Sequence, residues 1–344
     1  MALEATWYAS RLRQELCVRN RRYAQGMAHV ESYGSSPVIV YAPEGGRHGN
    51  FIDAAYAAIT ARPEWMRRFG KIHAQAARSL PKAERRWREL DSSMSSDALL
   101  MNVFCTPGVA DSTAVQNMLG VEAGSAPAFG WKARVPLTSG QFDRTEVDMR
   151  FGALLVEAKL TESDFQTREA AIVEAYRDFE EVFERELLPR IEMPPKRRKA
   201  RTEFPEDYSQ EFESFVDEEA AALGLLPEPQ IAAKPGATAA DAMDVAEPGY
   251  ASYQLIRNVL AAHAAQCSFC VLHDERRPDL REEWFRVMAA VKSADLRTRL
   301  KVLTWQELAA ALPDDLQEFL DVKYGIAAPG KTVSPVEDIP DFGT

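Results

Sequence analysis

The sequence predicts an α/β fold in which helices flank a small mixed sheet, and two observations carry this prediction. Helical and strand-like segments alternate from residue 91 onward. Apolar residues make up 46% of the 344 residues, which is enough to bury a sizeable core. The same composition excludes a wholly disordered, collagen-like or coiled-coil protein.

The sequence also predicts a reduced, cytoplasmic protein without a membrane partner. The first residues include Glu4 and lack a basic stretch followed by an apolar one, and no apolar run approaches the ~18 residues that a membrane span needs. Four cysteines are too few for a disulfide framework in a chain of this length. Cys267 and Cys270 form a lone C-x-x-C, and no second pair completes a zinc site.

Residues 1–90 predict a mostly helical N-terminal region. Apolar residues at helical spacing around Leu12 and Leu16 predict one helix, and residues 50–62 predict another that a proline ends. A strand is expected between them at residues 37–41. This region carries 15 basic and 8 acidic residues, a charge of +7, whereas the whole chain carries −11. The basic portion could follow a phosphate backbone, or it could be a solvated helix face.

The next segment predicts a helix followed by a hairpin. A run of serines supplies good N-caps for a helix over residues 97–104. Two strands are expected at 144–150 and 153–159, joined by a tight turn at Phe151-Gly152.

Residues 166–249 predict a helical insertion and a disordered linker. From 167 to 190, apolar residues at helical spacing describe one amphipathic helix with an acidic outer face. Residues 194–248 then combine a basic run, an acidic block and an Ala/Pro-rich stretch, which rarely build a core. We expect this last segment to be a flexible insertion.

Ordered elements return after residue 249. The pattern predicts three further helices, at 250–263, 280–291 and 305–312. It also predicts two strands, at 267–273 and 300–304. The expected core therefore comprises residues 91–165 and 250–325, and a tail follows at 326–344. Residues 325–332 match G-x-x-x-x-G-K-[ST]. A helix rather than a strand is expected before them, so we do not expect a phosphate-binding loop.

The densest chemistry lies on the predicted hairpin, where two carboxylates and an ammonium converge. Alternation along a strand places Glu157 and Lys159 on one face. With the turn predicted above, Asp148 lies opposite Leu155 and diagonal to Glu157, whereas Glu146 lies directly across from Glu157. Carboxylates hold Mg²⁺, and a lysine can orient or help deprotonate an attacking water. The alternative is a solvated hairpin face, since Asp/Glu-x-Lys tripeptides are abundant.

Asp148, followed by eight residues and then Glu157-Ala-Lys159, resembles the motif of the PD-(D/E)XK nuclease superfamily. Flanking strings resemble those of a restriction-endonuclease-like bacterial family within it: Ser95-Ser-Asp-Ala-Leu-Leu-Met-Asn-Val-Phe104, Glu157-Ala-Lys-Leu-Thr-Glu162, Tyr253-Gln-Leu-Ile-Arg-Asn258 and Thr304-Trp-Gln-Glu-Leu308. The resemblance covers roughly residues 90–165 and 250–312.

This resemblance implies a restriction-endonuclease-like αβββαβ core that hydrolyses DNA phosphodiester bonds. It implies Asp148 and Glu157 as ligands of Mg²⁺ or Mn²⁺, the Ala158 carbonyl as a further ligand, and Lys159 as the catalytic lysine. Asp97 matches an extra acid that some members carry on the helix before the hairpin.

Two further positions follow from the same resemblance. Gln254 and Arg257 stand where other members place polar residues on the helix beside the site. No proline precedes Asp148, which leaves Glu146 as an alternative for the first acid.

The sequence therefore predicts a metal-dependent nuclease of the restriction or defence type, with DNA as its partner. The alternative function is a nucleic-acid-binding or protein-interaction module that keeps the fold without turnover. Whether two copies form a homodimer is left open by the sequence.

Overall fold

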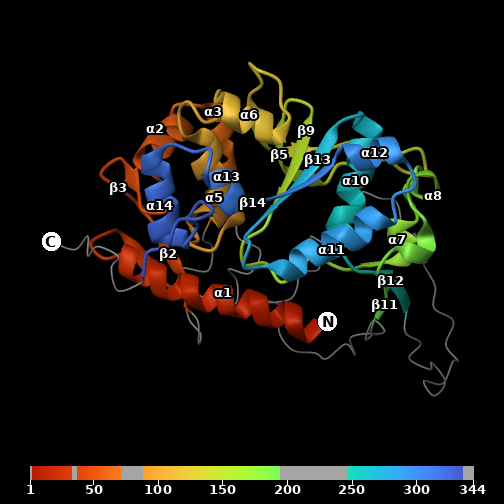
Figure 1. The fold of residues 1–344 in the computed structure, drawn as a ribbon, viewed down its shortest axis with the longest axis horizontal. Helices are drawn as coiled ribbons and strands as arrows, with labels where there is room; N and C mark the ends of the chain where they lie inside the picture. Colours follow the sequence, from red (N-terminus) through yellow and green to blue (C-terminus); the bar gives the residue numbers. More distant parts are fainter. Residues whose placement is uncertain (1, 33–36, 72–87, 194–246, 336–344) are drawn as a thin grey trace, which may run out of the picture.

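The computed structural model describes residues 2–32, 37–71, 88–193 and 247–335. They form a five-stranded mixed sheet with helices on both faces (Figure 1). The predicted α/β class is confirmed. The predicted flexible insertion at 194–248 lies almost wholly outside the described residues.

The central sheet has the order β14-β13-β9-β8-β5. Its strands are β5 (Pro127–Lys132), β8 (Glu146–Phe151), β9 (Leu154–Ala158), β13 (Ser268–His273) and β14 (Leu300–Thr304). β8 is antiparallel to both of its neighbours, β5 and β9, whereas β9, β13 and β14 run parallel to one another. The carboxyl end of β9 therefore lies at the same edge as the carboxyl end of β13.

Each face of the sheet packs against its own helical layer (Figure 1). Val156 faces α5 (Ser96–Cys105) and α13 (Trp305–Ala309), whereas Leu155 faces α10 (Tyr253–Ala265) and α11 (Pro278–Ala289). Buried strands with apolar residues on both faces are typical of a sheet that helices cover on both sides. A third apolar cluster joins α5 to α2 (Asp53–Thr60) in the N-terminal region.

The hairpin between β8 and β9 corrects the predicted register. Its turn is Gly152-Ala153, because Phe151 pairs with Leu154 and remains in the strand. Phe151 is fully buried and its ring packs 5.8 Å from that of Phe104 in α5. Gly152 adopts a φ of +58°, which glycine accepts without strain. The predicted turn at Phe151-Gly152 was thus one residue too early, and the cross-strand partners change accordingly.

The N-terminal region contains the predicted strand and helices together with short strands that the sequence did not predict. The chain runs through α1 (Ala2–Tyr23), β1 (His29–Glu31), β2 (Ile39–Tyr41), β3 (Pro43–Glu44), β4 (Arg47–His48), α2, α3 (Pro63–Met66), η1 (Arg67–Gly70) and η3 (Glu89–Asp91). β1 and β2 pair in an antiparallel ribbon.

The single amphipathic helix predicted for residues 167–190 is wrong. The chain forms short pieces instead: β10 (Arg168–Glu169), α7 (Ala170–Val173), α8 (Phe179–Val182), η4 (Arg185–Leu187) and β11 (Arg190–Met193), which pairs with β12 (Glu247–Tyr250). Between α7 and α8 the backbone bonds to another segment, since Thr138 N donates to Ala175 O and Arg177 N donates to Pro136 O. These tertiary hydrogen bonds replace those of a continuous helix, although the apolar side chains are buried as the spacing implied.

The remaining elements are α6 (Thr113–Leu119), β6 (Val135–Pro136), β7 (Phe142–Asp143), α12 (Ala294–Thr298) and α14 (Asp314–Tyr324). The helices predicted at 250–263, 280–291 and 305–312 and both late strands are present as α10, α11, α13, β13 and β14. Within the described residues, no helix is both long and apolar enough to cross a membrane.

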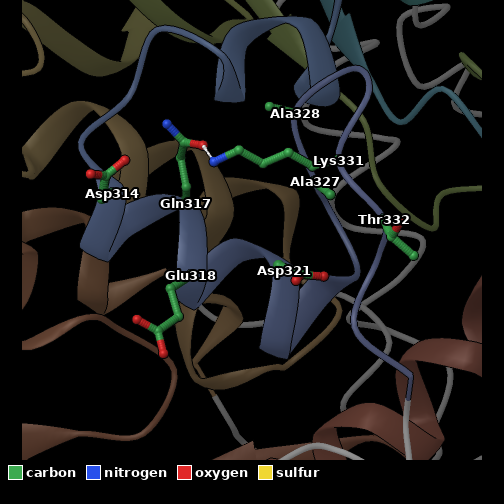
Figure 2. Close-up of a pocket in the computed structure, with 8 residues that line it drawn as sticks. All are labelled: Asp314, Gln317, Glu318, Asp321, Ala327, Ala328, Lys331 and Thr332. Atoms are coloured by element: carbon green, nitrogen blue, oxygen red, sulfur yellow. Dashed lines mark hydrogen bonds between the residues drawn. The ribbon is translucent and has the colours of Figure 1, made fainter.

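The G-x-x-x-x-G-K-[ST] match does not form a phosphate-binding loop. α14 rather than a strand precedes it, and Gly325 is the left-handed C-cap of that helix. Figure 2 shows the adjoining cavity of about 270 Å³, which the carboxylates of Asp314, Glu318 and Asp321 line. Lys331 donates to Gln317 Oε1 at 2.8 Å beside them. The acidic lining and the preceding helix both disagree with a nucleotide phosphate site.

Candidate active site

The hairpin brings the predicted carboxylates together more closely than the predicted register did. Continuing the observed pairing places Asp148 directly opposite Glu157, on the same face of the sheet. The backbone N–H of Ala158 donates to Asp148 Oδ2 at 2.8 Å. The two carboxylates therefore share one end of the sheet, at the carboxyl end of β9.

Glu157 is held from both sides. Its side chain is buried, with the residue 3% exposed, and Lys159 Nζ donates to Oε1 at 2.8 Å. Asn258 Nδ2 of α10 donates to Oε2 at 2.9 Å. Arg257 Nη1 in turn donates to Asn258 Oδ1 at 2.9 Å, and its Nε donates to Asp143 Oδ2 at 2.8 Å. The carboxylate plane of Glu157 is thus fixed.

Lys159 lies between the strand and α10. Its Nζ donates to Gln254 Oε1 at 2.8 Å in addition to Glu157, and the ammonium lies 5.4 Å from the centre of the Phe165 ring. Burial by itself lowers the pKa of Lys159, but the carboxylates of Glu157, Glu162 and Asp148 outweigh it and hold the pKa above its ordinary value. Lys159 is therefore a protonated hydrogen-bond donor at neutral pH.

Asp148 is the carboxyl group with the least compensation. Burial raises its pKa well above the ordinary value, and the carboxylates of Glu157 and Asp97 raise it further. Lys159 and the N–H of Ala158 oppose this rise without cancelling it. Two facing carboxyl groups of this kind repel each other until a cation lies near them.

Asp97 stands at the start of α5, whose N-cap Ser95 accepts a hydrogen bond from Ala98 N. Its Oδ2 lies 2.7 Å from Arg68 Nη2 and 3.3 Å from Lys71 Nζ. Burial raises the pKa of Asp97, and the two cations lower it by more, so that the net pKa is below the ordinary value. Asp97 is near enough to influence Asp148 but is itself bound in an ion pair.

Glu146 is bound to Arg68 and is not the cross-strand partner of Glu157. It pairs across the strand with Lys132 of β5, and its Oε2 accepts from Arg68 Nη1 at 2.6 Å. The predicted position of Glu146 directly across from Glu157 is wrong, because the hairpin turn lies one residue later. The observed register favours Asp148 over Glu146 as the first acid of the motif.

The sequence did not predict two residues that bind the side chains of the site, Asn258 and Arg68. Asn258 follows Gln254 by four residues on one helix, so helical spacing could have indicated that both reach the same site. Arg68 comes from a segment outside the resemblance, and no local pattern connects it with Asp97. The solvated-face alternative is also wrong, because Glu157 and Lys159 are only 3% and 5% exposed.

The donor set at this end of the sheet fits Mg²⁺ or Mn²⁺. Asp148 and Glu157 supply two carboxylates, and Ala158, whose carbonyl is the third expected ligand, directly follows Glu157 at the end of β9. Mg²⁺ keeps several waters and is usually bound by one or two carboxylates plus substrate phosphates. Over residues 2–32, 37–71, 88–193 and 247–335, no three His, Cys, Asp or Glu side chains are grouped so as to hold a metal by themselves.

The fold and this site together define a class. A five-stranded mixed sheet between helical layers, with an acid and Glu-x-Lys at adjoining strand ends, is an α/β restriction-endonuclease-like fold. The chain belongs to the family described as Restriction Endonuclease associating with ARP, whose model matches residues 17–325. No curated protein and no solved structure matches the chain.

Proposed function

We propose that the protein is a metal-dependent deoxyribonuclease that hydrolyses DNA phosphodiester bonds in restriction or defence. The observation that carries the proposal is the buried Glu157–Lys159 pair facing Asp148, the carboxyl group with the least compensation. A buried carboxyl group that no cation pairs with is costly, so a functional reason for Asp148 is expected. Membership of a restriction-endonuclease family supports the same conclusion.

The side chains take distinct roles. Asp148, Glu157 and the carbonyl of Ala158 would hold Mg²⁺ or Mn²⁺, which supplies Lewis acidity to the scissile phosphate when bound. Lys159, kept protonated by its neighbours, orients the attacking water. Gln254 fixes the ammonium of Lys159 through its 2.8 Å hydrogen bond.

We also propose how the chain is organised around this chemistry. Residues 91–165 and 250–325 form the nuclease core, residues 1–90 an accessory region, residues 166–249 an insertion and residues 326–344 a tail. The family description names association with ARP, so a partner of that kind is proposed beside DNA. We propose a cytoplasmic location and a homodimer as well.

The experiment is cleavage of supercoiled plasmid, single-stranded DNA and RNA by the purified chain with Mg²⁺, with Mn²⁺ and with EDTA. We expect DNA cleavage with either metal and none with EDTA. Asp111→Asn, which removes an exposed carboxylate away from the site, is the control and should cleave as the parent does. DNA binding without cleavage under every metal condition would instead support a catalytically inactive module.

A further inference from the structure

A segment of the N-terminal region delivers two cations to the edge of the candidate site. Arg68 of η1 contacts Asp97 Oδ2 through Nη2 at 2.7 Å and Glu146 Oε2 through Nη1 at 2.6 Å. Lys71, three residues later, contacts Asp97 at 3.3 Å and Glu89 at 2.8 Å. Neither cation bonds to Asp148 or Glu157 in the described structure.

A glycine of β5 leaves room for the guanidinium of Arg68. Arg68 is 8% exposed, and a Cβ on Gly130 would lie 2.4 Å from its Nη1. Gly130 also adopts a φ of +61°, which disfavours a side chain there. A side chain at position 130 of β5 would therefore displace the guanidinium from the carboxylates that it binds.

The ion pairs divide the carboxylates at this edge into two sets. Asp97 and Glu146 are bound to Arg68, whereas the hydrogen bond to Asp148 within the described part of the chain comes from the backbone N–H of Ala158. Asp97 does not join the facing pair as a third ligand. In agreement with this, the described residues contain no group of three side chains that could hold a metal.

We propose that Arg68 is a positioning residue that holds Asp97 in an ion pair apart from Asp148 and Glu157, so that the site takes up one divalent cation. This inference rests on the proposed metal-dependent function. A guanidinium beside the acids also opposes a second cation directly, because like charges at such separations repel. Arg68 thereby sets both the number of cations and the affinity for the one that binds.

The test is isothermal titration of the full chain with Mn²⁺ in the absence of DNA. The parent should bind one equivalent. Arg68→Met should bind Mn²⁺ about fivefold more tightly, or bind a second equivalent, because Asp97 keeps only its longer contact with Lys71 and a repelling charge is lost. Adding Asp97→Asn to Arg68→Met should return the parent behaviour, and Arg68→Lys should stay close to the parent.

A merely structural role for Arg68 gives the opposite result. In that case Arg68→Met would loosen the site, lose thermal stability and bind Mn²⁺ more weakly. Arg19→Met, which removes another buried arginine paired with Glu15 at 2.9 Å, is the matched control and should lower stability without changing Mn²⁺ affinity. Gly130→Ala displaces Arg68 without altering any charge and should tighten Mn²⁺ binding as Arg68→Met does.

The outcomes separate this inference from the proposed function. Two equivalents in the parent, or an Arg68→Met titration that matches the parent, would overturn the role of Arg68 and leave the metal site standing. No Mn²⁺ binding by the parent would overturn both.

Discussion

At the scale of the residue, Lys159 shows how environment decides a role. Its ammonium is buried and bonds to both Glu157 and Gln254 at 2.8 Å. Three carboxylates raise its pKa above the ordinary value against the effect of burial. A lysine of this kind donates hydrogen bonds at neutral pH and is a poor base, so we assign it to orienting water.

Lys159→Met should therefore lower single-turnover DNA cleavage by about 100-fold, the size of effect expected when a reacting group is no longer held in position. Mg²⁺ affinity should stay similar or rise, because one positive charge beside the carboxylates is gone. Lys331→Met is the matched control, since Lys331 also bonds to a glutamine oxygen at 2.8 Å but is exposed. Unchanged cleavage by Lys159→Met would remove Lys159 from the mechanism.

A second buried lysine affects stability instead. Lys323 of α14 is fully buried, its Nζ donates to Asn20 Oδ1 at 2.7 Å, and it lies 4.2 Å from the centre of the Tyr41 ring. Burial lowers the pKa of Lys323 well below its ordinary value. Because the folded state then binds fewer protons than the unfolded chain, this group destabilises the fold increasingly as pH falls below about 10.4.

Lys323→Met should therefore be more stable than the parent at neutral pH. The difference should shrink as pH rises from 7 toward 10, where the unfolded lysine also becomes neutral. Urea unfolding of both proteins at several pH values measures it. A pH-independent difference would show that the lysine is charged in the folded state.

At the scale of the element, the hairpin shows which features of the fold could be predicted from the sequence. The two strands, their Asp and Glu-x-Lys residues and the helix bearing Gln254 were predictable, because alternation and helical spacing are local. The turn was placed one residue early, since only packing of Phe151 against Phe104 keeps it in the strand. β5 was not predicted from the residues, although the resemblance implied a third core strand.

Longer-range features escaped prediction for a related reason. The spacing at residues 167–190 described burial correctly, but pairing with residues 136–138 broke the helix. Arg68 reaches Asp97 across 29 positions. No periodicity encodes such a contact, which depends on how the N-terminal region packs on the core.

The ends of the insertion lead to a prediction at the same scale. β11 and β12 pair so that Met193 lies opposite Glu247. A short Gly/Ser turn can therefore replace residues 194–246 without moving either strand. We expect unfolding of this shortened chain to stay cooperative, with a midpoint close to that of the parent, as measured by circular dichroism. A large loss of thermal stability would show that the segment packs on the core.

At the scale of the whole molecule, the N-terminal region and the core act as one unit. The family match begins at residue 17 within α1 and continues to residue 325. α1 packs along α14 at the other end of the chain, where Asn20 Nδ2 donates to Lys323 O at 3.3 Å (Figure 1). The segment that carries Arg68 is held to the core by its own contacts, because Phe69 packs in one apolar cluster with Ala98 and Met101 of α5.

The central claim is that Asp148 and Glu157 form a metal site that cleaves DNA. The most direct measurement is Mg²⁺-dependent plasmid cleavage by Asp148→Asn, Glu157→Gln and Glu146→Gln, with thermal unfolding of each followed across a Mg²⁺ titration. Asp148→Asn and Glu157→Gln should abolish cleavage and reduce stabilisation by Mg²⁺. Metal-free Asp148→Asn should be as stable as the parent or more so, because a repelling charge is gone. Metal-free Glu157→Gln should be less stable, because it leaves the buried ammonium of Lys159 without its ion-pair partner.

Glu146→Gln should have a smaller effect, since Glu146 bonds to Arg68, and Asp148 rather than Glu146 lies opposite Glu157. Inactivation by Glu146→Gln with full activity of Asp148→Asn would contradict the assignment of the first acid. Full metal-dependent cleavage by all three variants would contradict the site itself.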